Sequence, residues 1–170
     1  MRISHIIAAL AVSIAVCFLS FDTADARTVV TKKSIRKGAI LVDTSQRRLY
    51  LGLGNGKAIA YTVGVGRASK QWTGTKRIRS KRKKPAWSPT AQIRRDKPNL
   101  PKVIPGGSPR NPMGAAALVL SGGGQYAIHG TNNPGSIGGF VSYGCIRMHN
   151  RDIKHLYARV RVGTKVTVVR

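Results

Sequence analysis

The sequence has no glutamate and only five aspartates, against 30 lysine and arginine residues, so its formal net charge is +25. A surface this basic attracts polyanionic partners through long-range, salt-sensitive electrostatics. For an intracellular protein the natural partner would be nucleic acid, whereas for an exported protein it would be the anionic cell envelope. The choice between these partners depends on whether the chain is exported.

Cysteine is scarcer still, with Cys17 in the N-terminal apolar run and Cys145 near the C-terminus. Once the N-terminal run is removed, one cysteine remains and an internal disulfide is excluded. The fold must then rest on packing, even in an oxidising compartment. A single cysteine left over in an exported chain is a candidate reactive thiol.

Long hydrophobic runs are also missing. The apolar run from Ile6 to Leu19 has about fourteen residues, where a membrane span needs about 20. Arg2 precedes this run, and small residues follow it at Ala24 and Ala26, which is typical of a secretory signal peptide. We expect residues 1–26 to be cleaved, with an uncleaved anchor as the alternative, and residues 27–170 to form one domain in the periplasm or cell wall.

Alternating apolar and polar residues predict three antiparallel strands in residues 39–43, 47–53 and 57–66, with Asn55-Gly56 as a hairpin turn. Three further strands are predicted in residues 115–120, 126–130 and 164–170. The strand in residues 47–53 should bury the face that carries Leu49, Leu51 and Leu53. The strand in residues 57–66 should bury the face that carries Ile59, Tyr61, Val63 and Val65.

One short C-terminal helix is predicted, with Asn150 as its N-cap and Gly163 beyond its end. Its buried stripe consists of Ile153, Leu156, Tyr157 and Val160 at helical spacing. There is no internal repeat. The fold class is therefore mainly β, a sandwich or barrel-like mixed sheet with one short helix.

Between Arg67 and Pro112 the strand pattern gives way to glycine, proline and basic residues, which predicts long ordered loops around a site. Seven of the nine residues from Lys76 to Lys84 are cations. We interpret this basic run as a solvated loop, with a loop that contacts the cell wall as the functional alternative.

The stretch "YAIHGTNNPGSIGGFVSYGCIRMHN" contains the candidate site. A cysteine attacks as the thiolate, so a catalytic one needs a base within hydrogen-bond reach. His129 ends a predicted strand, and the Gly-rich connection to Cys145 allows the two side chains to converge. Gly144 permits a tight turn whose N–H groups point at one spot, as in an oxyanion hole. Cysteine is also among the most buried residues, so spacing alone leaves core and catalysis open.

The residues "HGTNNPGSIGGFVSYGCIRMHNRDI" closely resemble the signature of the L,D-transpeptidase catalytic domain family of the YkuD type, in its ErfK-like branch. The segments "ILVDTSQRRLYL" and "YTVGVGR" are similar to the same family, so the resemblance covers nearly all of residues 27–170. It implies the β-sandwich of that family and no metal or cofactor. It also implies 3→3 cross-linking of diaminopimelate-containing peptidoglycan stems through a cysteine thioester, and sensitivity to carbapenems.

The resemblance also implies roles for single residues. Cys145 becomes the nucleophile and His129 its base, and the backbone carbonyl of Gly130 orients His129. The backbone N–H groups of Tyr143, Gly144 and Cys145 are expected to hold the oxyanion.

Two positions depart from the family pattern. Tyr143 stands where many members have histidine, and a tyrosine with a pKa near 10 acts there only through hydrogen bonds. Arg147 stands where another branch has asparagine, and its planar fork suits a substrate carboxylate, with an ordinary exposed arginine as the alternative. Ser142 and Thr131 either support the cysteine turn or touch substrate.

Other functions remain open at this point. The same acyl-enzyme with another acceptor would give carboxypeptidase activity, D-amino-acid exchange or attachment of an envelope protein to peptidoglycan. A non-catalytic cell-wall-binding protein is the alternative from another class. Nucleic-acid binding is not expected of an exported chain, and we expect a monomer.

Overall fold

The computed structural model describes residues 27–31, 34–123 and 126–170. The predicted signal peptide, residues 1–26, lies outside these described residues. Within the described part of the chain, no helix combines the length and apolarity needed to cross a membrane.

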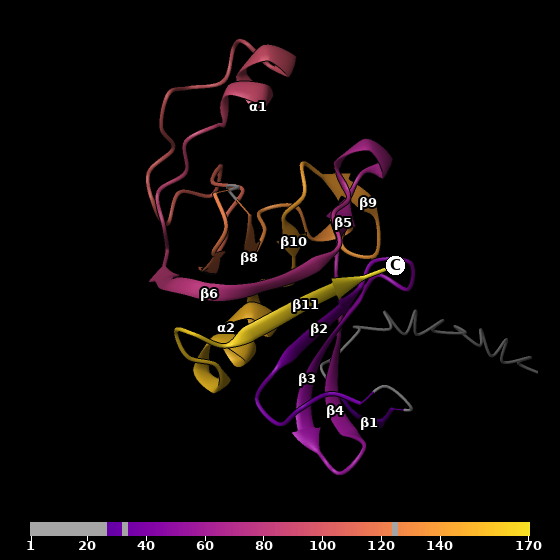
Figure 1. Cartoon of the computed structure of the whole chain (residues 1–170). Helices are drawn as coiled ribbons and strands as arrows, with labels where there is room; N and C mark the ends of the chain where they lie inside the picture. The colour runs from indigo at the N-terminus through magenta and orange to yellow at the C-terminus, as the bar shows by residue number, and fades with distance from the viewer. Residues whose placement is uncertain (1–26, 32–33, 124–125) are drawn as a thin grey trace, which may run out of the picture.

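A large mixed sheet dominates the molecule, with nine strands in the order β1-β4-β3-β2-β11-β6-β7-β8-β10 (Figure 1). A two-stranded sheet is formed by β5 and β9. The prediction of a mainly β fold is confirmed. The strands are β1 Arg27–Val30, β2 Ile40–Asp43, β3 Arg48–Gly54, β4 Lys57–Thr62, β5 Val65–Gly66, β6 Gly74–Lys83, β7 Ala116–Leu120, β8 Ala127–His129, β9 Phe140–Ser142, β10 Ile146–Arg147 and β11 Lys165–Val169.

The predicted antiparallel strands are confirmed as β2, β3 and β4, and the Asn55-Gly56 turn joins the last two. Leu49 and Leu51 are buried as expected, but Leu53 is 39 % exposed. The register of β3 against β4 shifts between Gly52 and Gly54, and this bulge turns Leu53 away from the core. In β4, Ile59 is only half-buried.

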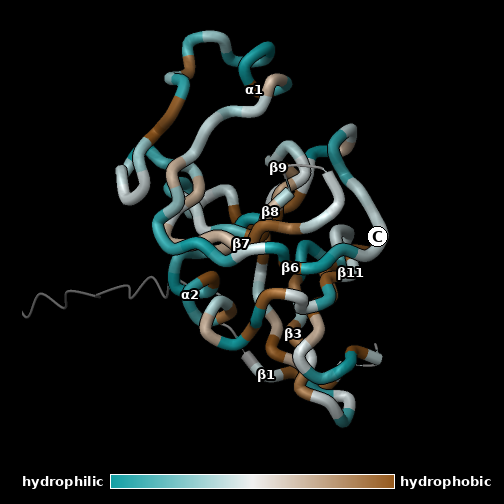
Figure 2. Tube along the Cα trace, turned by 60° about the vertical axis from the view of Figure 1, so that its left-hand side comes forward, coloured by the Kyte–Doolittle hydropathy of each residue, from teal (hydrophilic) through white to brown (hydrophobic). Residues whose placement is uncertain are grey.

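The prediction that the basic run from Lys76 to Lys84 is a solvated loop is wrong, because all of it except Lys84 belongs to β6. Residues 74–77 pair with β11 and residues 78–83 pair with β7, so β6 joins the two halves of the large sheet. Figure 2 shows its hydrophilic residues running through the middle of the molecule. Backbone pairing on both sides and one buried side chain, Ile78, suffice to hold this strand, while its cations stay at or near the surface.

One of these cations has a structural role at the end of the C-terminal helix. Lys81 Nζ donates to the carbonyl oxygens of Tyr157 and Val160, at 2.7 and 2.6 Å. Carbonyl groups at a helix C-terminus have no partner within the helix and favour a positive charge, so Lys81 caps the helix from the neighbouring strand.

The predicted C-terminal helix is α2, Asn150–Arg159, which buries Ile153 and Leu156 against β7 and β8. Its N-cap is His149, one residue before the predicted Asn150, since the Asn150 side chain is used elsewhere. A second helix, α1, Ala91–Asp96, was not predicted; Thr90 caps it by accepting a hydrogen bond from the Ile93 N–H. Two short 3-10 turns complete the helical elements, Ala68–Lys70 and Pro134–Ser136.

Residues 84–115 form an excursion between β6 and β7 that carries α1, here called the α1 arm (Figure 1). Trp87 and Ile104 pair across it through two backbone hydrogen bonds. Buried Asn111 donates to three backbone carbonyl groups of the arm and accepts from the Met113 N–H. The arm is therefore an ordered structure of its own, as expected of a long loop that rims a site.

Candidate active site

The candidate residues are brought together by the parallel pairing of β8 with β10. Ile146 lies opposite Ile128, and Arg147 lies opposite His129. Ile128 and Ile146 belong to the hydrophobic core, and side chains alternate between the two faces of a sheet. His129 and Arg147 therefore lie side by side on the face that points away from the core. Cys145, two residues before Arg147, immediately precedes β10 and reaches this face.

His129 is buried, with 4 % of its surface exposed. Its Nδ1 lies 2.6 Å from the carbonyl oxygen of Gly130, and because a carbonyl only accepts, Nδ1 carries the proton. Burial lowers the pKa of His129 to about 4; the backbones of Gly130 and Pro112 oppose this shift, and Arg147 reinforces it. The neutral imidazole thus has an unprotonated Nε2, which is the form that a general base requires.

Cys145 is half-buried. Burial raises the pKa of its thiol above the usual value, while a hydrogen bond with the backbone of Ala127 and the charge of Arg147 act in the opposite direction. At neutral pH, Cys145 is therefore a thiol and His129 a neutral imidazole, and the thiolate forms only as a base removes the proton.

Ser142 fixes the turn that carries the cysteine. Its Oγ donates to the Cys145 carbonyl at 2.6 Å and accepts from the Gly144 N–H at 3.0 Å. The Gly144 carbonyl in turn accepts from Nε1 of Trp72, which stacks on Tyr126. Gly144 has φ +113°, and a Cβ there would lie 2.5 Å from the Tyr126 ring, so glycine is required. Because the Gly144 N–H is already used by Ser142, it is the weakest of the three expected oxyanion donors.

The side chain of Arg147 has a buried nitrogen whose hydrogen-bonding capacity is not used within the described residues. Its backbone is fixed by two hydrogen bonds with Gly64. Its Nε is buried and has no hydrogen-bond partner among the described residues. Burial lowers the pKa of the guanidinium, whereas Cys145 raises it. A buried donor without a partner costs free energy, so this position favours an incoming acceptor such as a carboxylate.

Thr131 belongs to the support of the site. Its Oγ1 accepts from the Asn133 N–H at 3.0 Å and donates to the Asn133 carbonyl, and the residue is buried. Both hydrogen-bonding functions of the hydroxyl are thus directed at the chain just after His129. This geometry favours the supporting role of the two that were expected.

Asn150 is a residue whose role at the site the sequence did not reveal. Its Oδ1 accepts from the N–H groups of Ala115 and Thr131, and its Nδ2 donates to the Thr131 carbonyl at 2.9 Å. A Cβ on Gly130 or Gly114 would lie 2.2 Å from this Oδ1. Because both positions are glycine, the Asn150 side chain of α2 has room to connect the end of the α1 arm to the segment after His129 through hydrogen bonds.

Tyr143 points away from the reacting groups and toward the α1 arm. Its hydroxyl donates to Asp96 Oδ2 at 2.7 Å, and Arg67 donates to the same oxygen at 2.9 Å. The Arg67 guanidinium also lies over the Tyr143 ring, 4.1 Å from its centroid. Hydrogen bonds from Tyr143, Arg67 and Gln92 lower the pKa of Asp96 to about 2. We call this contact between the arm and the cysteine turn the Asp96 latch.

Among the described residues, no group of three or more histidine, cysteine, aspartate or glutamate side chains is placed to hold a metal ion.

Fold and site together define a class: mainly β domains with a buried histidine on one strand and a cysteine just before the parallel strand beside it. Comparison with known families makes this specific, because the family model described as "L,D-transpeptidase catalytic domain" matches residues 37–168. The chain belongs to this family.

Curated relatives agree with this assignment. "Probable L,D-transpeptidase YbiS" of Escherichia coli K12 is 36% identical over 149 residues, which cover 83% of this chain and 47% of the relative. "Probable L,D-transpeptidase ErfK/SrfK" of the same organism is 37% identical over 150 residues, covering 83% and 46%. The chain thus spans about half the length of these relatives.

Solved structures show the same fold. One example is the catalytic domain of the Enterococcus faecium L,D-transpeptidase acylated by ertapenem. It has a TM-score of 0.59 at 17% sequence identity, and the match covers 81% of this chain and all of that one.

The Asp96 latch predicts that Tyr143→Phe loosens the α1 arm. The variant keeps the ring under Arg67 but removes the hydroxyl that donates to Asp96, so amide hydrogen exchange in residues 91–97 should become roughly three- to tenfold faster. Tyr50→Phe is the matched control, because it removes the exposed hydrogen bond from Tyr50 to Gln46 far from the arm. Unchanged exchange in the arm of Tyr143→Phe would contradict a latch.

The electrostatics of the pair predict how Cys145 reacts with iodoacetamide as pH changes. His129 has a pKa of about 4 and the thiol pKa is raised, so neither group changes its charge between pH 5 and pH 8. The rate should stay low in this range, without an inflection near 6.5, and rise only above the pH at which N-acetylcysteine, the control, reacts. A high rate that stays constant between pH 5 and 8 would indicate a thiolate–imidazolium pair instead.

Proposed function

We propose that this protein is an exported cysteine L,D-transpeptidase that acts on peptidoglycan stem peptides. The observation that carries the proposal is the site on β8 and β10, where a buried neutral His129 and Arg147 lie side by side next to the Cys145 turn. The buried imidazole presents the unprotonated Nε2 that proton abstraction requires. Family membership supports the reaction class and the kind of substrate.

In the proposed reaction, the Cys145 thiol gives its proton to Nε2 of His129 while sulfur attacks a carbonyl carbon. The carbonyl belongs to the amide between the L-centre of diaminopimelate and the D-alanine that follows it. The C–N bond then breaks, the amine of D-alanine takes the proton from His129, and a thioester remains. An amine of a second stem attacks the thioester and passes its proton through His129 to the departing sulfur. The product is a 3→3 cross-link.

The remaining site residues have supporting parts in this proposal. The N–H groups of Tyr143 and Cys145 hold the developing oxyanion, with less from Gly144 because Ser142 already accepts its N–H. Arg147 binds a carboxylate of the stem peptide, which satisfies its buried Nε. Tyr143 does not share in proton transfer, because its hydroxyl is directed at Asp96.

Export is part of the same proposal. It rests on the signal-peptide pattern of residues 1–26, on family membership and on the basic composition, which suits an anionic envelope. Residues 27–170 then form the catalytic domain, and a mature N-terminus at Arg27 in an envelope fraction is its signature.

Purified tetrapeptide stems incubated with the enzyme test the proposal directly. The protein should release D-alanine and form 3→3 dimers, and a carbapenem should add its full mass to Cys145 through opening of the β-lactam ring. Cys145→Ala should show neither reaction while keeping the unfolding midpoint of the parent. Identical products from Cys145→Ala would contradict the assigned nucleophile.

The same mass spectra show which molecule accepts the acyl group from the thioester. Tripeptides alone indicate water, and exchange of the fourth residue for an added D-amino acid indicates exchange activity. No product and no carbapenem adduct from the parent protein would favour a wall-binding protein without catalysis.

The proposed role of Arg147 predicts that Arg147→Gln lowers kcat/KM about 10- to 100-fold, as expected for the loss of a charge-assisted hydrogen bond. Stems with each free carboxylate amidated in turn identify the group that Arg147 binds, because the loss should largely vanish for one of them. Arg79→Gln, on the exposed side of β6, is the control. An equal loss on every amidated stem would contradict carboxylate recognition.

A further inference from the structure

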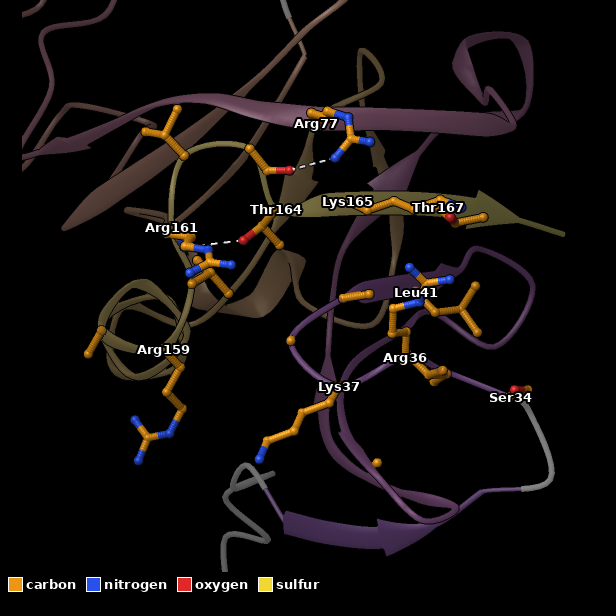
Figure 3. Close-up of a pocket in the computed structure, with 18 of the residues that line it drawn as sticks. Ser34, Arg36, Lys37, Leu41, Arg77, Arg159, Arg161, Thr164, Lys165 and Thr167 are labelled. Atoms are coloured by element: carbon orange, nitrogen blue, oxygen red, sulfur yellow. Dashed lines mark hydrogen bonds between the residues drawn. The ribbon is translucent and has the colours of Figure 1, made fainter.

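A second concave site lies outside the active site. It is a groove of about 1300 Å³ between the segment that leads into β2, the β3–β4 turn, β6 and the C-terminal end of α2 (Figure 3). None of the residues assigned to the Cys145 site lines it. The volume exceeds the roughly 300–1,000 Å³ of most small-molecule pockets, so it suits several units of a longer chain.

The groove is lined by six cations and by no carboxylate. Three segments far apart in the sequence supply them: Arg36, Lys37, Arg77, Arg159, Arg161 and Lys165. Figure 3 shows these side chains around one opening. Two of the four guanidinium groups donate to nearby carbonyl oxygens, Arg77 to Gly163 and Arg159 to His155.

The positive charge of the groove is not neutralised by nearby acids. The described residues include three aspartates, and each has hydrogen bonds or a salt bridge elsewhere: Asp43 with Ser45, Asp96 with Tyr143 and Asp152 with Arg151. A concave surface of one sign focuses the electric field and concentrates counter-ions. The groove therefore favours a ligand that carries several negative charges.

The shape and chemistry of the lining narrow the class of polyanion. No aromatic side chain lines the groove, so there is no platform for stacking bases, which disfavours single-stranded nucleic acid. A concave groove also fits a chain better than a flat bilayer. Arginine forks match phosphate, whose tetrahedral oxygens can bridge cations on facing walls, whereas a planar carboxylate is satisfied by one fork.

The backbone leaves room for such a chain. Gly38 and Gly163 both line the groove, and a Cβ added to either would meet no atom within 4 Å. Both glycines lie in turns with positive φ. Their N–H groups donate to the carbonyl oxygens of Gly52 and Ile78, so the room for a ligand is the space beside each Cα, which no side chain fills.

We propose that this groove binds a linear phosphate polymer, with successive phosphates along Arg36, Arg77 and Arg161 and their neighbouring cations. Such a site would hold the protein on a phosphate-rich polymer without involving the Cys145 site. It does not depend on the proposed transpeptidase activity, and its test is separate.

The test compares two variants of equal net charge in the full mature chain. The groove variant carries Arg36→Gln, Lys37→Gln, Arg159→Gln and Arg161→Gln. The control variant carries Lys57→Gln, Arg79→Gln, Arg82→Gln and Lys154→Gln, four exposed cations outside the groove. Affinity for fluorescently labelled linear inorganic polyphosphate is measured by anisotropy at several salt concentrations, with inorganic phosphate as the monomeric competitor.

The groove variant should lose at least about tenfold in affinity. Its plot of log affinity against log salt should become shallower by about 3, since each cation contributes about 0.7 on a flexible polyanion. The control should change little in both quantities. An unchanged thermal unfolding midpoint reports that the groove variant is folded, and because this readout does not use the Cys145 site, failure of the groove proposal and failure of the proposed function are distinguishable.

Four results would overturn the proposal. Equal losses in both variants would show that binding follows net charge alone. Equally tight, groove-dependent binding of single-stranded DNA would assign the groove to nucleic acid, and the same result with anionic phospholipid vesicles would assign it to a lipid surface. Parent protein that does not bind polyphosphate at low salt would also refute it.

Discussion

The parallel pairing of β8 with β10 is the constraint on which the candidate site depends. Because paired residues of parallel strands point to the same face, the register that places Ile146 beside Ile128 in the core also places Arg147 beside His129 on the opposite face. A slip of one residue would bury Arg147 in the core and remove it from the histidine. Burial of Ile128 and Ile146 sets the register of the two strands, and this register also sets the positions of His129 and Arg147. The connection between the strands can therefore be irregular.

The scarcity of acidic residues has a structural counterpart. Asp43 accepts hydrogen bonds from Ser45 and from the Gln46 N–H in the β2–β3 turn, Asp96 forms the latch, and Asp152 lies in the first turn of α2. Each carboxylate has a local task in a turn, a latch or a helix start. In the whole sequence, 30 lysine and arginine residues stand against five aspartates, so the cations cannot all be paired and groups of them remain for other ligands.

Sequence patterns predicted the elements whose side chains alternate or recur at helical spacing, such as β3 and α2, because burial of one face determines both the pattern and the element. They failed for β6, where Ile78 is the one fully buried side chain and two neighbouring strands supply the stabilisation. The family signature indicated Cys145 and His129. It did not indicate Asn150 or Asp96, since their importance comes from contacts with residues 19 and 47 positions away.

The substitution of tyrosine beside the cysteine turn bears on which group moves the proton in the proposed reaction. An imidazole at position 143 could exchange protons near neutral pH, whereas the hydrogen bond to Asp96 and burial raise the pKa of Tyr143 above its already high value. Its hydroxyl is also turned toward the α1 arm. In the proposed reaction, proton transfer therefore falls to His129, whose low pKa keeps its ring neutral at pH 7, while Tyr143 links the arm to the turn that carries Cys145. With tyrosine at position 143, the proposed proton transfer belongs to His129 on β8, and Tyr143 attaches the α1 arm to the cysteine turn.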